Sequence, residues 1–448
     1  MTQGAVRTVV LVDGEHYPPV TRWAIDEAVS AGHDVVLALV VGGTEKVQPG
    51  ALPDVGVPVR DAGPDAAATL ATTIDDLRPG LILDLSDEPI LGYRERLALA
   101  SVALARGIPY LGADFRLEPP AREPPPPGVP TVAVIGTGKR TGKTAIAGEV
   151  ARLADRRGLA PVIVAMGRGG PPEPQVAEAG SVSLERLLAL VRTGQHAASD
   201  YLEDALTTGV TTVGARRAGG GLSGAAYVTN VSEALAVAAA RRPGVVVLEV
   251  SGAAIPPIAW DAGVLVVPAN VPLEYVRGYL GPYRLLRTDL AVVTMANSVP
   301  EAERVSDLTT HLRSALGDAG CIVTEFHPVP LGSVRGRDAF FATTAPGAVA
   351  ARQVERLQAE HGCRVVGWSA RLADRAGLLE DLEGADTFDV LLTELKAAAV
   401  DVAAEHAVAR GADVVFVDNR AEVIDGSVDL HTALGEVLEL AEGRTKHR

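Results

Sequence analysis

One nine-residue segment, Gly136-Thr-Gly-Lys-Arg-Thr-Gly-Lys-Thr144, constrains the fold of this chain more than any other. It follows the short apolar run Thr131–Ile135, which is typical of a buried strand, and precedes Thr144–Arg157, which has helical periodicity. A glycine-rich loop between a strand and a helix directs backbone N–H groups and the helix N-terminus at an anion. The sequence therefore predicts a P-loop, and with it an α/β sheet.

The spacing within this loop indicates a task for most of its residues. Lys143 is placed to reach the β- and γ-phosphate oxygens of ATP, and the hydroxyl group of Thr144 is placed to hold Mg²⁺. Lys139 and Arg140 add positive charge near the γ-phosphate or a second substrate, so we predict both, with Lys143, as catalytic. The predicted nucleotide-binding residues of the loop are Gly138, Lys139, Arg140, Thr141, Gly142, Lys143 and Thr144.

A carboxylate that holds the metal is expected at the end of a neighbouring strand. The apolar run Val245–Glu249 ends in such a residue, and Ser251 and Gly252 beyond it are small enough to leave room for phosphates. We therefore predict Glu249 and Thr144 as the Mg²⁺ ligands. A strand-end glutamate that only faces water remains the alternative.

Three arginines are the main candidates for binding an anionic substrate. Arg168 follows the predicted strand Pro161–Ala165 and lies between two glycines, so we predict it as catalytic. Arg216 and Arg217 precede the flexible run Gly219–Gly224, which can fold over an anion. A solvated surface pair is an equal alternative for these two.

Weaker candidates lie further along the chain. Asn297 follows the predicted strand Leu290–Thr294, and we predict that it recognises adenine. Arg335 and Arg337 form a second possible anion site between small residues. Asp418–Arg420 closes the last predicted strand, where a simple turn is the alternative to a role in the site.

Glu15 and His16 follow the first predicted strand, Thr8–Val12, at the edge of the sheet where open α/β proteins bind ligands. We predict both as catalytic residues. His16 is a candidate proton carrier or phosphate partner, although a lone histidine more often has a structural role.

Short apolar runs alternate with helical patterns along the chain, which predicts parallel sheets covered by helices on both faces. The stretch 118–130 contains consecutive prolines, so it forms neither a helix nor a central strand. We therefore predict a Rossmann-like parallel-sheet domain at 1–118, a linker at 119–130, a larger P-loop α/β domain at 131–338 and a C-terminal α/β extension at 339–448.

The pattern inside the last segment predicts a strand at Ala339–Ala342, a helix at Gly347–His361, one long helix near Val390–Arg410 and a strand at Val414–Val417. Pattern alone leaves open whether this segment is independent or extends the P-loop sheet. The final stretch, Thr432–Arg448, is acidic until its last residues and is expected to form a solvated helix.

Charge and cysteine content limit the possible partners. The formal net charge is −15 and the pI is near 5.1, which argues against a general binder of nucleic acid or anionic membranes. Cys321 and Cys363 are expected to be reduced core thiols. No run approaches the ~20 apolar residues of a membrane span, and the first residues lack a signal-peptide pattern. We therefore expect a cytoplasmic protein that acts on a small anionic molecule.

Three segments together resemble the cyclic 2,3-diphosphoglycerate synthetase family: Val12–Pro19, the loop with its continuation Ala165–Pro171, and Glu249–Pro257. The resemblance runs over nearly the whole chain, including the proline-rich linker. It implies an enzyme that uses ATP and Mg²⁺ to close 2,3-bisphosphoglycerate into an internal anhydride, with release of ADP and phosphate. It also implies a homodimer.

The residues leave two other functions open. The loop begins at Gly136 rather than Thr137, which resembles dethiobiotin synthetase, so the acceptor could be a carboxylate activated as an acyl phosphate. A nucleotide-switched, partner-binding ATPase is the other alternative. Partitioning ATPases of the MinD and ParA type carry a signature lysine where this chain has Gly138, and Lys139 comes one place too late, which counts against this alternative.

Overall fold

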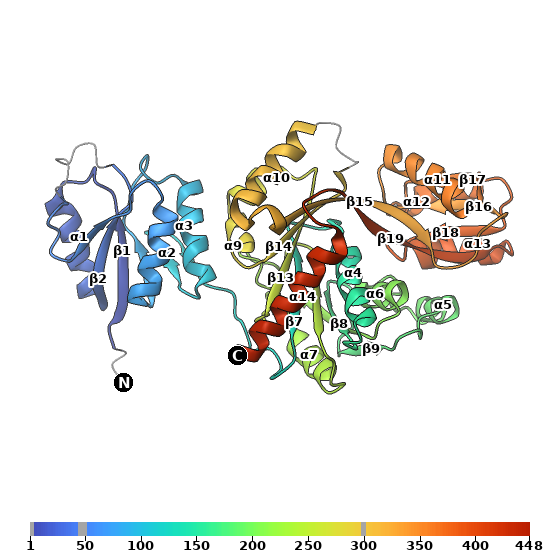
Figure 1. Ribbon diagram of the computed structural model, residues 1–448, viewed down its shortest axis with the longest axis horizontal. Helices are drawn as coiled ribbons and strands as arrows, with labels where there is room; N and C mark the ends of the chain where they lie inside the picture. Colours follow the sequence, from blue (N-terminus) through green and yellow to red (C-terminus); the bar gives the residue numbers. More distant parts are fainter. Residues whose placement is uncertain (1–3, 44–51, 297–301) are drawn as a thin grey trace. The chain divides into compact units, whose positions relative to one another are not determined.

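The computed structural model describes residues 4–43, 52–296 and 302–448. The chain folds into two compact units, and both consist of sheets covered by helices (Figure 1). The amino-terminal unit comprises Met1–Ala121 and Pro272–Arg287, and the P-loop unit comprises Arg122–Val271 and Thr288–Arg448.

The amino-terminal unit contains a six-stranded sheet among its described residues, in the order β3-β2-β1-β4-β5-β6. Neighbouring strands are parallel except β5 and β6. The strands are β1 (Val6–Val12), β2 (His33–Val40), β3 (Val59–Asp61), β4 (Leu81–Asp84), β5 (Tyr110–Leu111) and β6 (Arg116–Leu117). The helices are α1 (Pro18–Ser30), α2 (Ala66–Leu77), α3 (Tyr93–Ala105), α8 (Glu274–Arg277) and α9 (Gly281–Leu285).

Strand β1 divides this sheet into two halves. The chain passes from β1 to β2 and β3 on one side and then returns to place β4 and β5 on the other. Loops that leave two such central strands diverge and create a crevice at their carboxyl ends. Side chains of β1 alternate between two cores, with Val9 and Leu11 in one and Val10 and Val12 in the other, because successive strand residues face opposite sides.

The P-loop unit is built on a 13-stranded sheet among its described residues, ordered β11-β10-β8-β12-β7-β13-β14-β15-β19-β18-β16-β17, with β9 paired to β10. The first eight strands along the chain are β7 (Thr131–Gly136), β8 (Val162–Gly167), β9 (Gln175–Ala177), β10 (Thr212–Ala218), β11 (Val228–Thr229), β12 (Val246–Val250), β13 (Ala262–Pro268) and β14 (Leu290–Thr294). The remaining strands are β15 (Cys321–Pro330), β16 (Asp338–Ala342), β17 (Arg364–Ser369), β18 (Val390–Thr393) and β19 (Asp413–Asp425).

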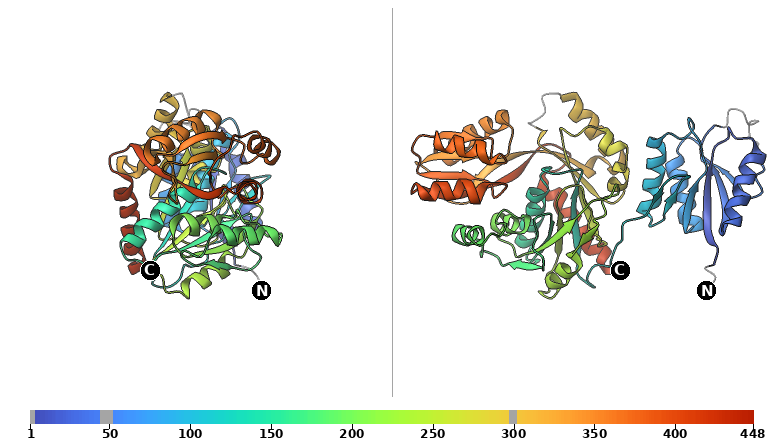
Figure 2. Two further views of the ribbon diagram at one scale, coloured as in Figure 1. Left: turned by 90° about the vertical axis from the view of Figure 1, so that its right-hand side faces the viewer. Right: turned by 180° about the vertical axis from the view of Figure 1, so that it is seen from behind.

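The helices that cover this sheet lie on both of its faces (Figures 1 and 2). Those before the C-terminal extension are α4 (Lys143–Arg156), α5 (Leu184–Arg192), α6 (Asp200–Thr208), α7 (Val231–Ala239), α10 (Ala302–Leu316) and the short η3 (Asp318–Gly320). Those that follow are α11 (Gly347–His361), α12 (Arg375–Glu383), the π-helical turn η4 (Ala399–Ala404), α13 (Glu405–Ala409) and α14 (Leu430–His447).

Strand β7 lies between β12 and β13, and all three are parallel and fully buried. The loop after β7 therefore opens at the same edge as the end of β12. In the register of the two strands, Glu249 is opposite Val134, two residues before the loop begins. Helix α4 covers β7 with an apolar face that includes Ile146 and Val150, as the spacing predicts.

The C-terminal segment extends the P-loop sheet. Strands β15 and β19 pair antiparallel from Val323 to Pro330, and this long ribbon leads to β18, β16 and β17 (Figure 2). The predicted long helix at Val390–Arg410 is wrong. Val390–Thr393 forms the buried strand β18, a turn follows in which Ala397 has a φ of 49°, and helical structure begins only at Ala399. The short apolar run fits a central strand because the neighbouring strands β16 and β19 bury it on both sides.

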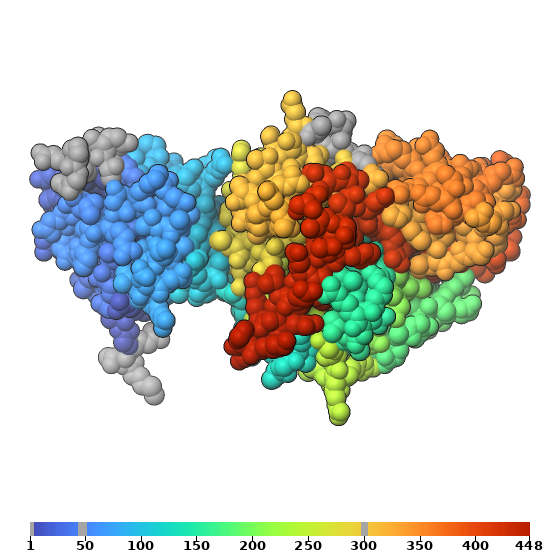
Figure 3. Space-filling model, viewed as in Figure 1, coloured from blue at the N-terminus to red at the C-terminus, as the bar shows by residue number. Residues whose placement is uncertain are grey.

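The predicted solvated helix at the C-terminus also needs correction. Helix α14 packs against α4 and strand β13, and its buried residues include Leu434, Val437, Leu438 and Ala441. Only its outer face lies at the surface (Figure 3). The spacing of three and four between these apolar residues produces one buried stripe, which the acidic composition of the segment obscures.

Cys321 and Cys363 are both free and buried, as predicted. Burial raises the pKa of the Cys321 thiol to about 11, so it stays protonated near neutral pH. Among the described residues, no helix is long and apolar enough to cross a membrane.

Candidate active site

A cavity of about 610 Å³ opens at the carboxyl ends of β7, β8 and β12 in the P-loop unit. The C-terminal extension forms its opposite wall. The P-loop side of the lining includes Lys139, Arg140, Thr141, Gly142, Lys143, Thr144, Arg168, Asp200, Glu203, Glu249, Ser251 and Gly252. The other side includes Thr344, Ala345, Pro346, Val349, Gln353, Glu394, Lys396 and Asn419.

The glycine-rich loop is held in a compact form by its own lysine. Lys143 donates hydrogen bonds to the carbonyl oxygen of Gly138 at 2.7 Å and to the hydroxyl oxygen of Thr141 at 3.1 Å. The backbone of Thr141 is fixed in turn, because the Thr294 hydroxyl group donates to its carbonyl oxygen at 2.7 Å. Burial lowers the pKa of Lys143 to about 8, although the nearby carboxylates of Glu249 and Asp200 act in the opposite direction.

The early position of the first glycine has a steric explanation. A Cβ atom on Gly136 would lie 2.9 Å from the Thr141 hydroxyl oxygen and 3.0 Å from Cδ of Lys143. It would also lie 3.0 Å from the carbonyl oxygen of Val266 on β13. At Thr137, one residue later, a side chain is accommodated. The glycine is therefore required where the lysine stem crosses the end of β7.

Thr144 and Glu249, the two predicted metal ligands, lie together. The hydroxyl oxygen of Thr144 is 3.4 Å from Oε1 of Glu249, and Oε2 of Glu249 is buried without a hydrogen-bond partner among the described residues. Burial raises the pKa of Glu249 to about 8; Asp200 adds to this rise and Lys143 opposes it. A buried carboxylate oxygen without a donor, next to a threonine hydroxyl group, is suited to a hard divalent cation.

Two arginines converge beside this pair. The guanidinium group of Arg217 donates to the carbonyl oxygens of Gly219 and Ser251, both at 2.8 Å, and its Nε has no partner among the described residues. A Cβ atom on Gly252 would lie 2.8 Å from Nη2 of Arg217 and 3.9 Å from Nη2 of Arg168, so both guanidinium groups approach one glycine. Burial and the charge of Arg168 lower the pKa of Arg217. Two like charges held this close favour an anion between them.

Helix α6 brings three acids to the site that the sequence analysis missed. Asp200 and Glu203 line the cavity, and Asp204 is fully buried behind them with neither carboxylate oxygen hydrogen-bonded to a described residue. Burial raises the pKa of all three, that of Glu203 to about 7. The available signal was that Glu203 and Asp204 follow Asp200 by three and four residues, a spacing that places all three on one helical face.

The wall formed by the extension also escaped prediction. Glu394 follows β18 and accepts hydrogen bonds from the hydroxyl groups of Thr343 at 2.7 Å and Thr344 at 2.9 Å. Lys396, two residues further, forms an ion pair of 3.0 Å with Glu203 on α6. The predicted long helix had assigned both Glu394 and Lys396 to an ordinary helical surface, which concealed them.

Some weaker candidates lie outside the cavity. Arg216 is exposed and donates to the carbonyl oxygen of Gly170 at 3.2 Å, so only Arg217 of that pair turns inward. Arg337 pairs with Asp413 at 2.7 Å in the extension, and neither it nor Arg335 lines the cavity. Arg216 and Arg337 therefore make local contacts outside the cavity, and the anion site suggested at Arg335 and Arg337 stays a prediction.

Of residues 418–420, two form ion pairs and one lines the cavity. Asp418 lies 3.2 Å from Arg152 and also pairs with Arg420, whereas Asn419 lines the cavity. Asn297, the residue predicted to recognise adenine, lies outside the described residues. Its role in adenine recognition therefore stays a prediction.

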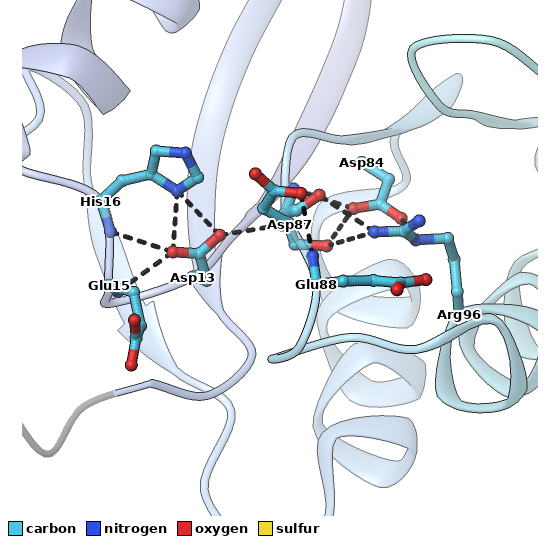
Figure 4. Close-up of polar contacts among 8 residues, drawn as sticks. Asp13, Glu15, His16, Asp84, Asp87, Glu88 and Arg96 are labelled. Atoms are coloured by element: carbon cyan, nitrogen blue, oxygen red, sulfur yellow. Dashed lines mark hydrogen bonds and ion pairs between the residues drawn. The ribbon is translucent and has the colours of Figure 1, made fainter.

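Glu15 and His16 belong to the amino-terminal unit, where they follow β1 at the crevice between β1 and β4. Asp13 organises this corner (Figure 4). Its carboxylate accepts from the backbone N–H groups of Glu15 and His16, both at 3.0 Å, and from that of Asp87 at 2.9 Å. Nδ1 of His16 lies 2.8 Å and 2.9 Å from the two carboxylate oxygens, which directs Nε2 away from Asp13. Burial raises the pKa of Asp13, but these hydrogen bonds outweigh it and the net pKa is lowered.

Strand β4, which pairs with β1, ends at Asp84, a second carboxylate that has hydrogen-bond and ion-pair partners. Asp84 forms an ion pair with Arg96 at 2.7 Å (Figure 4). It also accepts a hydrogen bond from the Tyr110 hydroxyl group at 2.8 Å. Arg96 also donates to the carbonyl oxygen of Ser86 at 3.0 Å. These contacts order the loop after β4, and the backbone N–H group of Asp87 in that loop donates to the Asp13 carboxylate, so the position of His16 depends on both strands.

Known proteins match the chain over both units. Family models of cyclic 2,3-diphosphoglycerate synthetase match with their N-terminal domain at residues 7–118, their P-loop domain at 131–325 and their C-terminal domain at 330–420. A protein named cyclic 2,3-diphosphoglycerate synthetase from Rubrobacter xylanophilus is 46% identical over 429 residues, which cover 94% of this chain and 96% of the relative.

Relatives of the same name occur in archaea. The protein from Methanothermus fervidus is 39% identical and the alignment covers 97% of each chain. That from Methanothermobacter thermautotrophicus is 41% identical over 98% of each chain. With three domain models in order along the chain and relatives this similar over nearly its full length, the protein belongs to the cyclic 2,3-diphosphoglycerate synthetase family.

Proposed function

We propose that the protein uses ATP and Mg²⁺ to join the two phosphate groups of 2,3-bisphosphoglycerate into an internal anhydride, with release of ADP and inorganic phosphate. The observation that carries this proposal is a single cavity lined by loop residues 139–144, Glu249 and Arg168, with Arg217 beside Arg168 at Gly252. The loop is suited to a triphosphate and the arginines to a second anion beside it. The name shared by the relatives supports this choice of acceptor.

Two phosphate groups of one molecule do not condense in water, so one of them must first receive a leaving group. In the first step, an oxygen of one substrate phosphate attacks the γ-phosphorus of ATP, and the bond to the β–γ bridging oxygen breaks to release ADP. In the second step, an oxygen of the other substrate phosphate attacks the phosphorus of the activated one. The transferred phosphate leaves with the bonding electron pair and takes up one proton, which completes inorganic phosphate.

The residues of the loop suit the first step. Lys143 already lies across the loop and can turn from the Gly138 carbonyl group to the β- and γ-phosphate oxygens. Lys139 and Arg140 are exposed on the cavity lining, where they can neutralise charge that spreads over the transferring oxygens. Arg168 faces the same space and holds the acceptor, so that both steps occur within one bound complex, where positioning lowers the barrier most.

Mg²⁺ suits the pair Thr144 and Glu249, because Oε2 of Glu249 is buried and no described residue donates a hydrogen bond to it. When bound, the ion neutralises charge on the β- and γ-phosphate oxygens. We also propose that Glu15 and His16, whose segment resembles the family, contribute to catalysis, and that Asn297, which follows the predicted strand Leu290–Thr294, recognises adenine. The same resemblance suggests a homodimer, and we propose a cytoplasmic protein whose acidic charge argues against a nucleic-acid partner.

Phosphorus NMR tests the reaction directly. With ATP, Mg²⁺ and 2,3-bisphosphoglycerate, the purified protein should produce a new internal-anhydride signal, ADP and inorganic phosphate in equal amounts. With 3-phosphoglycerate, which lacks the second phosphate, no cyclic product can form. If ATP is hydrolysed without the anhydride signal, or if no ATP is consumed with this acceptor, the proposed function is wrong.

A further inference from the structure

The C-terminal extension has a switch point of its own, and it faces the P-loop cavity. From β16 the chain passes through α11 to β17 on one side, and then through α12 to β18 on the other side of β16. Open parallel sheets bind ligands in the crevice at the carboxyl ends of two such strands. Here that crevice carries Thr344 after β16 and Glu394 and Lys396 after β18, and all three line the same cavity as Lys143.

Two features of this crevice suit an anion, the N-terminus of α11 and the ammonium group of Lys396. The N-terminus of the 15-residue helix α11 lies at the cavity wall, where Ala345, Pro346 and Val349 line it. Gln353, in the second turn of α11, is only 6% exposed and lines the cavity, and its Oε1 atom has no partner among the described residues. The helix N-terminus favours a negative charge, and Oε1 of Gln353, which is an acceptor, is suited to a hydroxyl group or a protonated oxygen of the same ligand.

Lys396 supplies the charge. Its backbone position is unusual, because the next residue, Ala397, has a φ of 49°, which is costly for a residue other than glycine. The ammonium group lies 3.0 Å from Glu203 and its side chain is 36% exposed, so it is reachable from the cavity. Asp200 interacts electrostatically with both Lys143 and Lys396, which places the two lysines around one small space.

The reaction proposed above needs a second phosphate site close to the first. The loop and its neighbouring carboxylate account for the triphosphate and metal, and Arg168 and Arg217 account for one acceptor group. We propose that Lys396, with the N-terminus of α11, binds the phosphate of the acceptor that ATP does not phosphorylate. In the ligand-free chain, the carboxylate of Glu203 occupies the position that this phosphate takes, and the phosphate displaces it from Lys396 when the acceptor binds.

Three substitutions at two residues distinguish a binding role of Lys396 from a merely structural ion pair. Lys396→Met should raise the KM for 2,3-bisphosphoglycerate by about tenfold to a hundredfold, the range expected for a lost charge-assisted contact, with the KM for ATP unchanged. Lys396→Arg should recover part of the loss. Glu203→Gln frees Lys396 from its carboxylate partner, so the acceptor should bind at least as tightly as to the wild type. If the ion pair is purely structural, Lys396→Met and Glu203→Gln should weaken acceptor binding to the same extent.

The matched control is Lys446→Met, which removes an exposed lysine in the last turn of α14. Thermal unfolding of each variant shows whether it is folded. Competition by 2-phosphoglycerate and 3-phosphoglycerate then identifies the contacted group: Lys396→Met should weaken inhibition by one of them and leave the other unchanged. Equal inhibition constants in wild type and variant for both compounds would overturn the proposal.

This inference rests on the proposed function, and the two can fail separately. If the wild type does not form the cyclic product, the reaction assignment fails. Calorimetric titration of 2,3-bisphosphoglycerate into the ADP complex of wild type and Lys396→Met still tests the crevice in that case. If the wild type makes the product and Lys396→Met binds the acceptor as well as the wild type does, only the assignment of Lys396 is wrong.

Discussion

Lys143 donates a hydrogen bond to the carbonyl oxygen of Gly138 at 2.7 Å, across the opening of the glycine-rich loop. In this position the lysine holds the loop in shape before any nucleotide is bound. In the function proposed above, the same ammonium group turns to the phosphate oxygens, so that a charged acceptor replaces the carbonyl group. The loop is therefore already ordered around the Lys143 ammonium group, which is the group proposed to contact the phosphates.

Replacing Lys143 with alanine should remove both functions of this ammonium group. We expect ATP turnover to fall by roughly 10²–10³-fold, the range seen when one group that stabilises the transferring charge is deleted. Fluorescence titration with an ATP analogue should show weaker binding as well. Lys139→Ala, which removes an exposed lysine of the same loop, should have a smaller effect. Undiminished nucleotide affinity and turnover in Lys143→Ala would contradict the assignment of the loop.

Gly136→Ala should disrupt the loop sterically. Its Cβ would lie within 3.0 Å of both the Thr141 hydroxyl oxygen and the Lys143 stem, so the loop must move. We expect a loss of about 1–3 kcal/mol in the free energy of unfolding and weaker ATP binding. Gly138→Ala is the matched control, because the nearest atom to its Cβ is 3.8 Å away. Equal behaviour of the two variants in denaturant titrations and nucleotide binding would show that the crowding at Gly136 is not decisive.

Glu249→Gln should change the response to Mg²⁺ more than the response to ATP. The neutral amide keeps the shape of the side chain but loses the charge that offsets a divalent ion next to Thr144. We expect the Mg²⁺ concentration for half-maximal activity to rise by about tenfold or more. The stabilisation of the ADP complex by Mg²⁺ in thermal unfolding should weaken in parallel. Glu233→Gln, on the exposed face of α7, provides the control, and an unchanged Mg²⁺ requirement in Glu249→Gln would exclude it as a ligand.

Gly252→Ala tests the arginine pair without altering either arginine. The added methyl group would lie 2.8 Å from Nη2 of Arg217 and displace its guanidinium group. Gly252 has a φ of +70°, so alanine also introduces backbone strain of about 1 kcal/mol. Gly158→Ala carries the same type of strain at a φ of +73° with open space around its Cβ, and so isolates the collision. We expect a higher KM for the acceptor in Gly252→Ala alone, and equal KM values in steady-state assays would contradict the role of Arg217.

The corner organised by Asp13 should respond to pH. Because hydrogen bonds from His16 and Asp87 lower its pKa below the ordinary value, its contribution to stability is present above that value and is lost as the pH falls through the folded pKa. Asp13→Asn should therefore be less stable than the wild type at pH 7. The difference in unfolding free energy should shrink below about pH 4, where the unfolded chain is protonated. A difference that is constant from pH 7 to pH 3 would show that the charge of Asp13 is not involved.

Much of the P-loop region could be predicted because its parts are contiguous. The strand, the loop and the first turn of α4 follow one another along the chain, so Lys143 and Thr144 are placed by local geometry alone. Glu249 was identifiable for a related reason. It ends an apolar strand, and parallel strands align their carboxyl ends at one edge.

The opposite wall of the cavity could not be predicted in this way. Val390–Thr393 is too short to distinguish strand from helix by periodicity, and the decision comes from its pairing with β16 and β19. Once that run was assigned to a helix, Lys396 lost its position at a strand end. Arg217 and Arg337 also look alike in sequence, since both stand near glycines, yet Arg217 approaches Gly252 at the cavity wall, whereas Arg337 pairs with Asp413 in the extension.

The difference between the residues that could be predicted from the sequence and those that could not has a physical cause. A motif whose residues are neighbours along the chain depends on backbone geometry and hydrogen bonds within a few residues, and these follow from local side-chain chemistry. The ion pair between Lys396 and Glu203 joins residues that are 193 positions apart in the sequence. It forms only because the β15–β19 ribbon places the extension beside the cavity. Contacts between residues this far apart in the sequence depend on how whole sheets and helices pack, so only the tertiary structure determines them.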